Sequence, residues 1–66
     1  MEEIRKFETR LGSVELVESD GMYYTRLRLA DGSYGDTSDL YEHEMPARNY
    51  YQFQCGWLEK MQRKEQ

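Results

Sequence analysis

Residues 14–29 read VELVESDGMYYTRLRL, two runs of alternating apolar and polar residues on either side of Asp20-Gly21. Alternation with a period of two is typical of strands with one buried face, and two-residue type I′ hairpin turns favour Asp-Gly. Such a turn fixes which residues lie opposite each other, so we expect Leu16 beside Thr25. The stretch therefore predicts an antiparallel hairpin.

A second turn is predicted at Gly12-Ser13, because glycine supplies the positive φ that a type II′ turn needs. This turn pairs Thr9 with Leu16 and Arg10 with Glu15, so its register and that of the Asp-Gly turn place the same side chains on one buried face. The predicted buried face carries Phe7, Thr9, Leu11, Val14, Leu16, Tyr23, Thr25, Leu27 and Leu29. The opposite, outer face carries Glu8, Arg10, Glu15, Val17, Tyr24, Arg26 and Arg28.

Asp31-Gly32 predicts a third turn, which places Tyr34 opposite Leu29 and adds an aromatic ring to the buried face. The turns together predict an antiparallel β-meander of three to four strands. The expected strands cover about residues 4–11, 14–19, 22–30 and 33–36.

The pattern changes period after Pro46, a residue that suits the first turn of a helix. Placed at helical spacing, residues 46–64 gather their apolar side chains on one broad arc. This arc carries Ala47, Tyr50, Tyr51, Phe53, Gln54, Cys55, Trp57, Leu58 and Met61. The sequence therefore predicts an α+β fold, a single domain over residues 1–66, in which one amphipathic helix packs on the apolar face of the sheet.

The cysteine content bears on the compartment and on reactivity. Cys55 is the only cysteine and cannot form an intrachain disulfide, so we expect a cytoplasmic protein. Its place at the edge of the apolar arc favours a packed, inert thiol over a nucleophile. No run approaches the roughly 20 apolar residues that a bilayer span requires, so we expect no membrane contact.

The acidic residues before the helix match known metal sites only in part. Asp31, Asp39 and Glu42 match positions of an EF-hand loop, but Asp36 stands where that loop requires glycine. Asp39, Glu42 and His43 form only a weak transition-metal pattern, because they are two hard carboxylates and one imidazole with no convergent partner. We expect neither a metal nor another cofactor.

Catalytic patterns are also weak. His43 is the only histidine and Cys55 the only thiol, and the sequence contains no glycine-rich phosphate loop. No triad or carboxylate pair can be defended from residue spacing. We therefore expect that the protein is not an enzyme.

The outer face of the sheet offers an alternative binding surface, because arginines beside a tyrosine ring can hold single-stranded nucleic acid. This surface consists of Arg10, Tyr24, Arg26 and Arg28. Glu8 and Glu15 share the face and the chain has a formal charge of -4, whereas phosphate binding depends on positive surface. Nucleic acid is therefore not the expected partner.

A protein partner is the class that the charge pattern favours most. Residues 31–44, here called the acidic segment, carry five acids and no lysine or arginine, and such a surface attracts basic partners. Tyr24, Tyr41 and Phe53 are expected to be accessible, and aromatic side chains often anchor interfaces. The predicted partner-binding residues are Asp31, Asp36, Asp39, Tyr41, Glu42 and Glu44.

Three functional hypotheses follow. The first is a small acidic binder or inhibitor that docks on a basic surface of a macromolecule such as a nucleic-acid enzyme, by analogy of size and charge with phage and mobile-element proteins. The second is a homodimer or larger homo-oligomer, a structural or regulatory domain that pairs its edge strands or helices. The third is a weak single-stranded nucleic-acid binder using the outer face. The alternative to all three is that the acids only keep the protein soluble.

Overall fold

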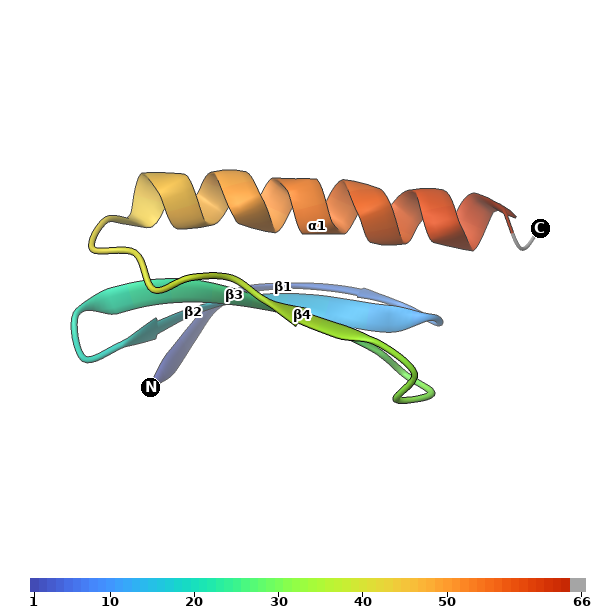
Figure 1. Ribbon diagram of the computed structural model, residues 1–66, viewed down its shortest axis with the longest axis horizontal. Helices are drawn as coiled ribbons and strands as arrows, with labels where there is room; N and C mark the ends of the chain where they lie inside the picture. The colour runs from blue at the N-terminus through green and yellow to red at the C-terminus, as the bar shows by residue number, and fades with distance from the viewer. Residues whose placement is uncertain (65–66) are drawn as a thin grey trace.

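The computed structural model describes residues 1–64 as a four-stranded antiparallel sheet with one helix across one face (Figure 1). The elements are β1 (Glu2–Thr9), β2 (Gly12–Ser19), β3 (Met22–Leu29), β4 (Gly35–Thr37) and α1 (Glu44–Lys64). The strands lie in the sheet in chain order. The predicted α+β class and the β-meander are confirmed.

The β2–β3 hairpin has the predicted register. Asp20 and Gly21 form its two-residue turn, with φ of 53° and 78°, and a type I′ turn requires positive φ at both positions. Leu16 lies opposite Thr25, as expected.

The β1–β2 turn lies two residues earlier than predicted. Thr9 pairs with Gly12, so Arg10 and Leu11 form the turn and the prediction of a turn beginning at Gly12 is wrong. A Cβ atom on Gly12 would overlap the carbonyl oxygen of Arg28 in β3, so the glycine is needed inside the strand, where two backbones approach closely. The Thr9 hydroxyl supports the turn by accepting the Leu11 N–H at 3.1 Å.

This correction changes cross-strand partners but not faces. Thr9 was expected opposite Leu16 and lies opposite Gly12, a displacement of four residues along β2. An even displacement leaves the side chains that remain in β1 and β2 on their predicted faces, because the side-chain period of a strand is two. Lys6, and not Arg10, is the β1 residue opposite Glu15.

The β3–β4 register is confirmed, and β4 begins two residues later and ends one residue later than the predicted strand 33–36. The Leu29 N–H donates to the Tyr34 carbonyl at 3.0 Å, which is the expected pair. Regular pairing in β4 begins at Gly35, because the Asp31 carboxylate accepts the N–H of Ser33 at 2.9 Å and its hydroxyl at 2.7 Å. These bonds hold residue 33 in the turn.

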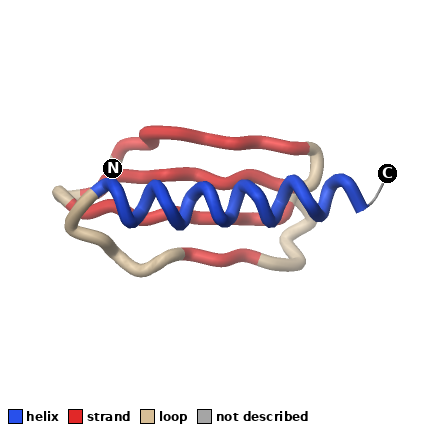
Figure 2. Tube along the Cα trace, turned by 90° about the horizontal axis from the view of Figure 1, so that it is seen from above, coloured by secondary structure: helices blue, strands red, loops and turns tan. Residues whose placement is uncertain are grey.

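The core lies between α1 and the two middle strands, over which the helix runs (Figure 2). Val14 and Leu27 from the sheet meet Leu58 from the helix. Thr25 and Gln54 are also buried, and the Thr25 hydroxyl donates to the Gln54 side-chain carbonyl at 2.6 Å. Both polar side chains therefore have partners across the sheet–helix interface.

The predicted apolar arc of α1 is too wide. Ala47, Gln54 and Leu58 are its fully buried residues, whereas Phe53 and Trp57 are 65% and 39% exposed. A straight helix contacts a sheet along one line of residues, so large side chains at the margin of the arc remain in solvent. The expectation that Phe53 is accessible is confirmed.

Val17 is the exception on the outer face. It points away from the helix, as predicted, but is only 2% exposed. In the sheet it lies between Glu3 of β1 and Tyr24 of β3, and the Tyr24 hydroxyl approaches the Met1 sulfur at 3.4 Å. The outer face thus has a small buried patch that the sequence pattern did not indicate.

Candidate binding groove

A groove lies between α1 and β4. The helix packs chiefly over β2 and β3, so β4 lies beside it and not beneath it (Figure 2). The groove has a volume of about 280 Å³. The following residues line it and define what is here called the aromatic groove: Leu27, Tyr34, Asp36, Tyr50, Phe53, Gln54 and Trp57.

Four aromatic rings form two pairs along the groove. The Tyr34 and Trp57 rings lie 5.5 Å apart between centroids, and the Tyr50 and Phe53 rings lie stacked at 5.9 Å. Tyr34 is 49% exposed, so three of the four residues present large apolar surface to solvent. Clustered exposed aromatic side chains are typical of binding surfaces, because rings bury large areas at low entropic cost.

The polar floor of the groove is held by hydrogen bonds. The Asp36 carboxylate accepts the Tyr50 hydroxyl at 2.7 Å and the Gln54 side-chain N–H at 3.0 Å. The bond to Asp36, together with burial, raises the pKa of Tyr50 from 10.0 to about 12, so this ring remains a neutral donor even near pH 10, where a free tyrosine is half ionised. The groove is therefore preformed, which lowers the entropic cost of binding.

Asp36 does not belong to an open acidic surface. Its side chain faces α1 and ties β4 to the helix, so reversing its charge would break this packing. Of the other predicted acids, Asp31 caps its own turn through Ser33. The hydrogen bonds from Ser33 hold the pKa of the Asp31 carboxyl below its usual value.

The rest of the acidic segment lies between β4 and the start of α1. Asp39 and Glu42 are exposed, and Glu44 forms an ion pair with Arg48 one helical turn on. Tyr41 is half-buried, and its backbone pairs with Tyr23 through hydrogen bonds of 2.7 and 2.8 Å. Within residues 1–64, no three His, Cys, Asp or Glu side chains converge as metal ligands.

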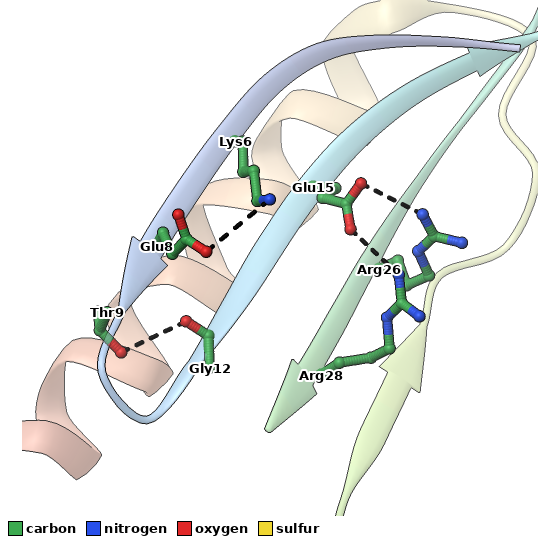
Figure 3. A network of polar contacts seen from close by, with 7 residues as sticks. All are labelled: Lys6, Glu8, Thr9, Gly12, Glu15, Arg26 and Arg28. Atoms are coloured by element: carbon green, nitrogen blue, oxygen red, sulfur yellow. Dashed lines mark hydrogen bonds and ion pairs between the residues drawn. The ribbon is translucent and has the colours of Figure 1, made fainter. Parts of the chain in front are cut away.

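Much of the positive charge on the outer face is paired with carboxylates of the same face. The Glu15 carboxylate forms ion pairs with the guanidinium groups of Arg26 and Arg28, each at 3.2 Å. The Lys6 ammonium group lies 3.9 Å from the Glu8 carboxylate (Figure 3). Burial raises the pKa of Glu15, but hydrogen bonds, two of them from these arginines, outweigh it and keep that pKa below its usual value.

Two of the four residues predicted for that surface differ from expectation in position or exposure. Arg10 lies in the β1–β2 turn and not beside Glu15, and Tyr24 is only partly exposed. A phosphate would have to compete with the Glu15 carboxylate for the remaining pair of arginines.

Cys55 is half-buried on the flank of α1 opposite the groove, in contact with the core. Burial raises the pKa of its thiol, so little thiolate forms at neutral pH. The chemistry available at this position is that of a small apolar residue.

Comparison with protein families, with curated proteins and with solved structures gives no match to this chain. Among residues 1–64, no helix combines the length and apolar character needed to cross a bilayer.

Sequence reasoning expected Phe53 to be accessible and named Asp36 as a partner-binding residue, but it predicted no groove and did not single out Tyr34, Tyr50 or Trp57. It assigned all three to the buried faces of the sheet and helix, because their spacing fits those faces. The signal that was available is the width of the apolar arc, which carries more large side chains than one line of contact can bury.

Proposed function

We propose that this protein binds another protein through the aromatic groove, with the acidic segment attracting the basic surface of that partner. The observation that carries the proposal is the exposure of Tyr34, Phe53 and Trp57 in one preformed groove. Apolar groups in contact with water favour association with a surface that covers them. Aromatic residues are also those that most often dominate interface energies.

Charge supports a basic partner. The acidic segment carries a formal charge of -5 with no lysine or arginine, and exposed Asp39 and Glu42 lie where the chain leaves β4 for α1. A field of one sign accelerates encounter with a surface of opposite sign. An enzyme that binds nucleic acid presents such a surface, and covering it would make this protein an inhibitor. The lone Cys55 supports a reducing, cytoplasmic setting for the interaction.

Nucleic acid itself is less well supported as the partner. Arg26 and Arg28 share the Glu15 carboxylate, so the outer face has little free positive charge. The exposed rings lie on the other side of the sheet, beside acids that would repel phosphates.

The test compares substitutions at two residues of similar exposure on the same helix. Phe53 lines the groove and is 65% exposed, whereas Met45 is 68% exposed and lies outside it. Tagged wild-type, Phe53→Ser and Met45→Ser proteins are used to capture partners from cells that contain this protein, and the captured protein is identified by mass spectrometry.

The dissociation constant is then measured with the purified partner. Phe53→Ser is expected to weaken binding at least about tenfold, the loss typical of truncating an anchoring ring, and Met45→Ser to leave it unchanged. Equal affinities for all three proteins would place the binding surface elsewhere.

A further inference from the structure

The free edge of β4 lies beside the aromatic groove, and the role assigned to it here rests on the proposed function. β4 pairs with β3 on one side only, and it forms one margin of the sheet (Figure 2). Unpaired backbone groups at such a margin can accept a strand from another chain.

The hydrogen-bond pattern shows which backbone groups of β4 point outward. The pairs Leu29 with Tyr34 and Thr25 with Ser38 both carry backbone bonds between β3 and the chain around β4. In an antiparallel ladder bonded and non-bonded pairs alternate, so Gly35 and Thr37 direct their N–H and C=O groups away from β3. Both residues are exposed.

The opposite margin of the sheet is protected by charge and a bulge, whereas β4 is protected only by its length of three residues and by the inward-pointing Asp36. Five of the eight residues of β1 are charged, and its pairing is interrupted by a β-bulge between Glu3 and Arg5. Charge and bulges are the usual means by which edge strands avoid added strands. β4 has neither at its exposed positions, Gly35 and Thr37.

Gly35 adds an independent indication. Its φ is not positive, and a Cβ atom there would make only ordinary contacts, 3.5 Å from the Leu27 carbonyl oxygen and 3.8 Å from the Arg28 side chain. The fold itself therefore does not require glycine at this position. Glycine in a strand often marks a place where another backbone approaches closely.

The aromatic groove lies on the helix side of the same strand. A strand added to β4 points alternate side chains toward the helix side, where the Tyr34, Phe53 and Trp57 rings are exposed. Backbone pairing and groove filling are therefore compatible in one extended segment.

Charge decides between a second copy of this chain and a foreign segment. Pairing two β4 edges would bring two acidic segments together, each with a formal charge of -5 and no lysine or arginine. Like charges across an interface oppose association. A basic segment removes this repulsion and gains attraction from Asp39 and Glu42.

We infer that the occupant of this site is an extended, basic segment of a partner protein, which adds to β4 as a fifth strand and places alternate apolar side chains in the aromatic groove. Backbone bonds to Gly35 and Thr37 hold the strand, and the rings select apolar residues at every second position.

The probes are three synthetic peptides: one of alternating arginine and valine, one of alternating glutamate and valine, and the arginine–valine peptide N-methylated at alternate residues. Hydrogen exchange at the Gly35 and Thr37 amides is followed by NMR, and Trp57, the only tryptophan, reports groove filling by fluorescence. The arginine–valine peptide is expected to slow exchange at both amides at least about tenfold, and the other two to leave it unchanged.

A protein variant provides a second test of strand addition. The Thr37 N–H does not bond β3, so Thr37→Pro is expected to preserve the fold but to abolish binding of the arginine–valine peptide. If this variant fails to fold, the N-methylated peptide still separates backbone pairing from side-chain contacts.

Three results would overturn the inference. Trp57 fluorescence that responds to the peptide while both amides exchange freely would mean that the groove binds side chains without an added strand, which leaves the proposed function intact. Equal protection by the glutamate–valine peptide would remove the basis for a basic occupant. Protection of both amides in the free protein, together with a dimer in sedimentation, would identify a second copy as the occupant. Failure of the proposed function is recognised separately, by unchanged partner affinity in Phe53→Ser.

Discussion

Leu16 and Val17 are neighbours in β2 that point to opposite faces of the sheet, and both are buried, at 0% and 2% exposure. Leu16→Ala is expected to lower the free energy of unfolding by about 2 to 5 kcal/mol, because it leaves a cavity under the helix. Val17→Ala removes two methyl groups at roughly 0.8 kcal/mol each, so its loss is expected to be about 1 to 2 kcal/mol.

Urea denaturation of the two variants measures both losses. A Val17→Ala protein as stable as wild type would show that the outer-face patch is open in solution. A Leu16→Ala loss no larger than that of Val17→Ala would contradict the placement of the main core beneath α1.

The raised pKa of Tyr50, a groove residue, makes the stability of the protein depend on pH. Its hydrogen bond to Asp36, with a contribution from burial, raises its pKa from 10.0 to about 12, so the folded state keeps a proton that the unfolded state loses. This contribution to stability is complete below pH 10 and is lost as the pH rises toward 12. Tyr50→Phe removes it, so the variant is expected to lose less stability than wild type over that interval.

The measurement is the urea midpoint of both proteins at the two ends of the interval. Tyr51 serves as a check on the method, because burial chiefly raises its pKa to about 12 as well, and it remains in both proteins. The same change of midpoint in wild type and Tyr50→Phe would mean that the bond to Asp36 does not form in solution.

At the scale of elements, the β2–β3 hairpin was predictable and the β1–β2 turn was not. The turn type at Asp20 and Gly21 can be predicted from these two residues alone, because both tolerate positive φ. Gly12 looks like a turn residue by the same criterion, yet it serves the close approach of β3. A requirement set by a non-neighbouring strand cannot be seen in the local sequence.

The helix was likewise predictable only in part. Its extent and its amphipathic character follow from spacing, but its position over β2 and β3 depends on which side chains interlock, and that position creates the groove. Asp39 and Glu42 could be predicted as exposed acids from the charge pattern. Trp57 could not be assigned to the groove, because spacing alone fits either margin of the buried arc.

Two glycines are expected to respond oppositely to substitution by alanine. Gly12→Ala forces a Cβ atom against the backbone of β3 and is expected to destabilise the protein. Gly56 lies within α1, where a Cβ atom would face open space beyond its own helix, so Gly56→Ala is expected to stabilise the protein by about 1 kcal/mol through helix propensity.

Thermal unfolding of the two variants beside wild type distinguishes these effects. Loss of stability in Gly56→Ala would point to a close contact at this position that the isolated chain does not show. An unchanged midpoint in Gly12→Ala would argue against the close approach of β2 and β3 at this position.

At the scale of the whole molecule, charge and aromatic surface are expected to affect binding differently. In Asp39→Lys/Glu42→Lys each substitution changes the charge by two, so the formal charge of the acidic segment goes from -5 to -1. Asp36 is left intact because it anchors the helix. The association rate with the captured partner is expected to fall in this variant while the fold survives.

Stopped-flow kinetics at low and high salt check this expectation. Added salt should slow association of the wild type more than that of the variant, because screening beyond a Debye length of about 8 Å at physiological ionic strength removes long-range attraction. If salt slows both proteins equally, the acids only solvate the segment between β4 and α1.

The most direct measurement of the central claim is an NMR map of the backbone amides of this protein, free and bound to the captured partner. Binding through the aromatic groove predicts the largest changes at residues 34–37 and on the Phe53 and Trp57 flank of α1. Changes centred on Tyr24, Arg26 and Arg28, with the groove amides unmoved, would contradict it and place the interface on the outer face of the sheet.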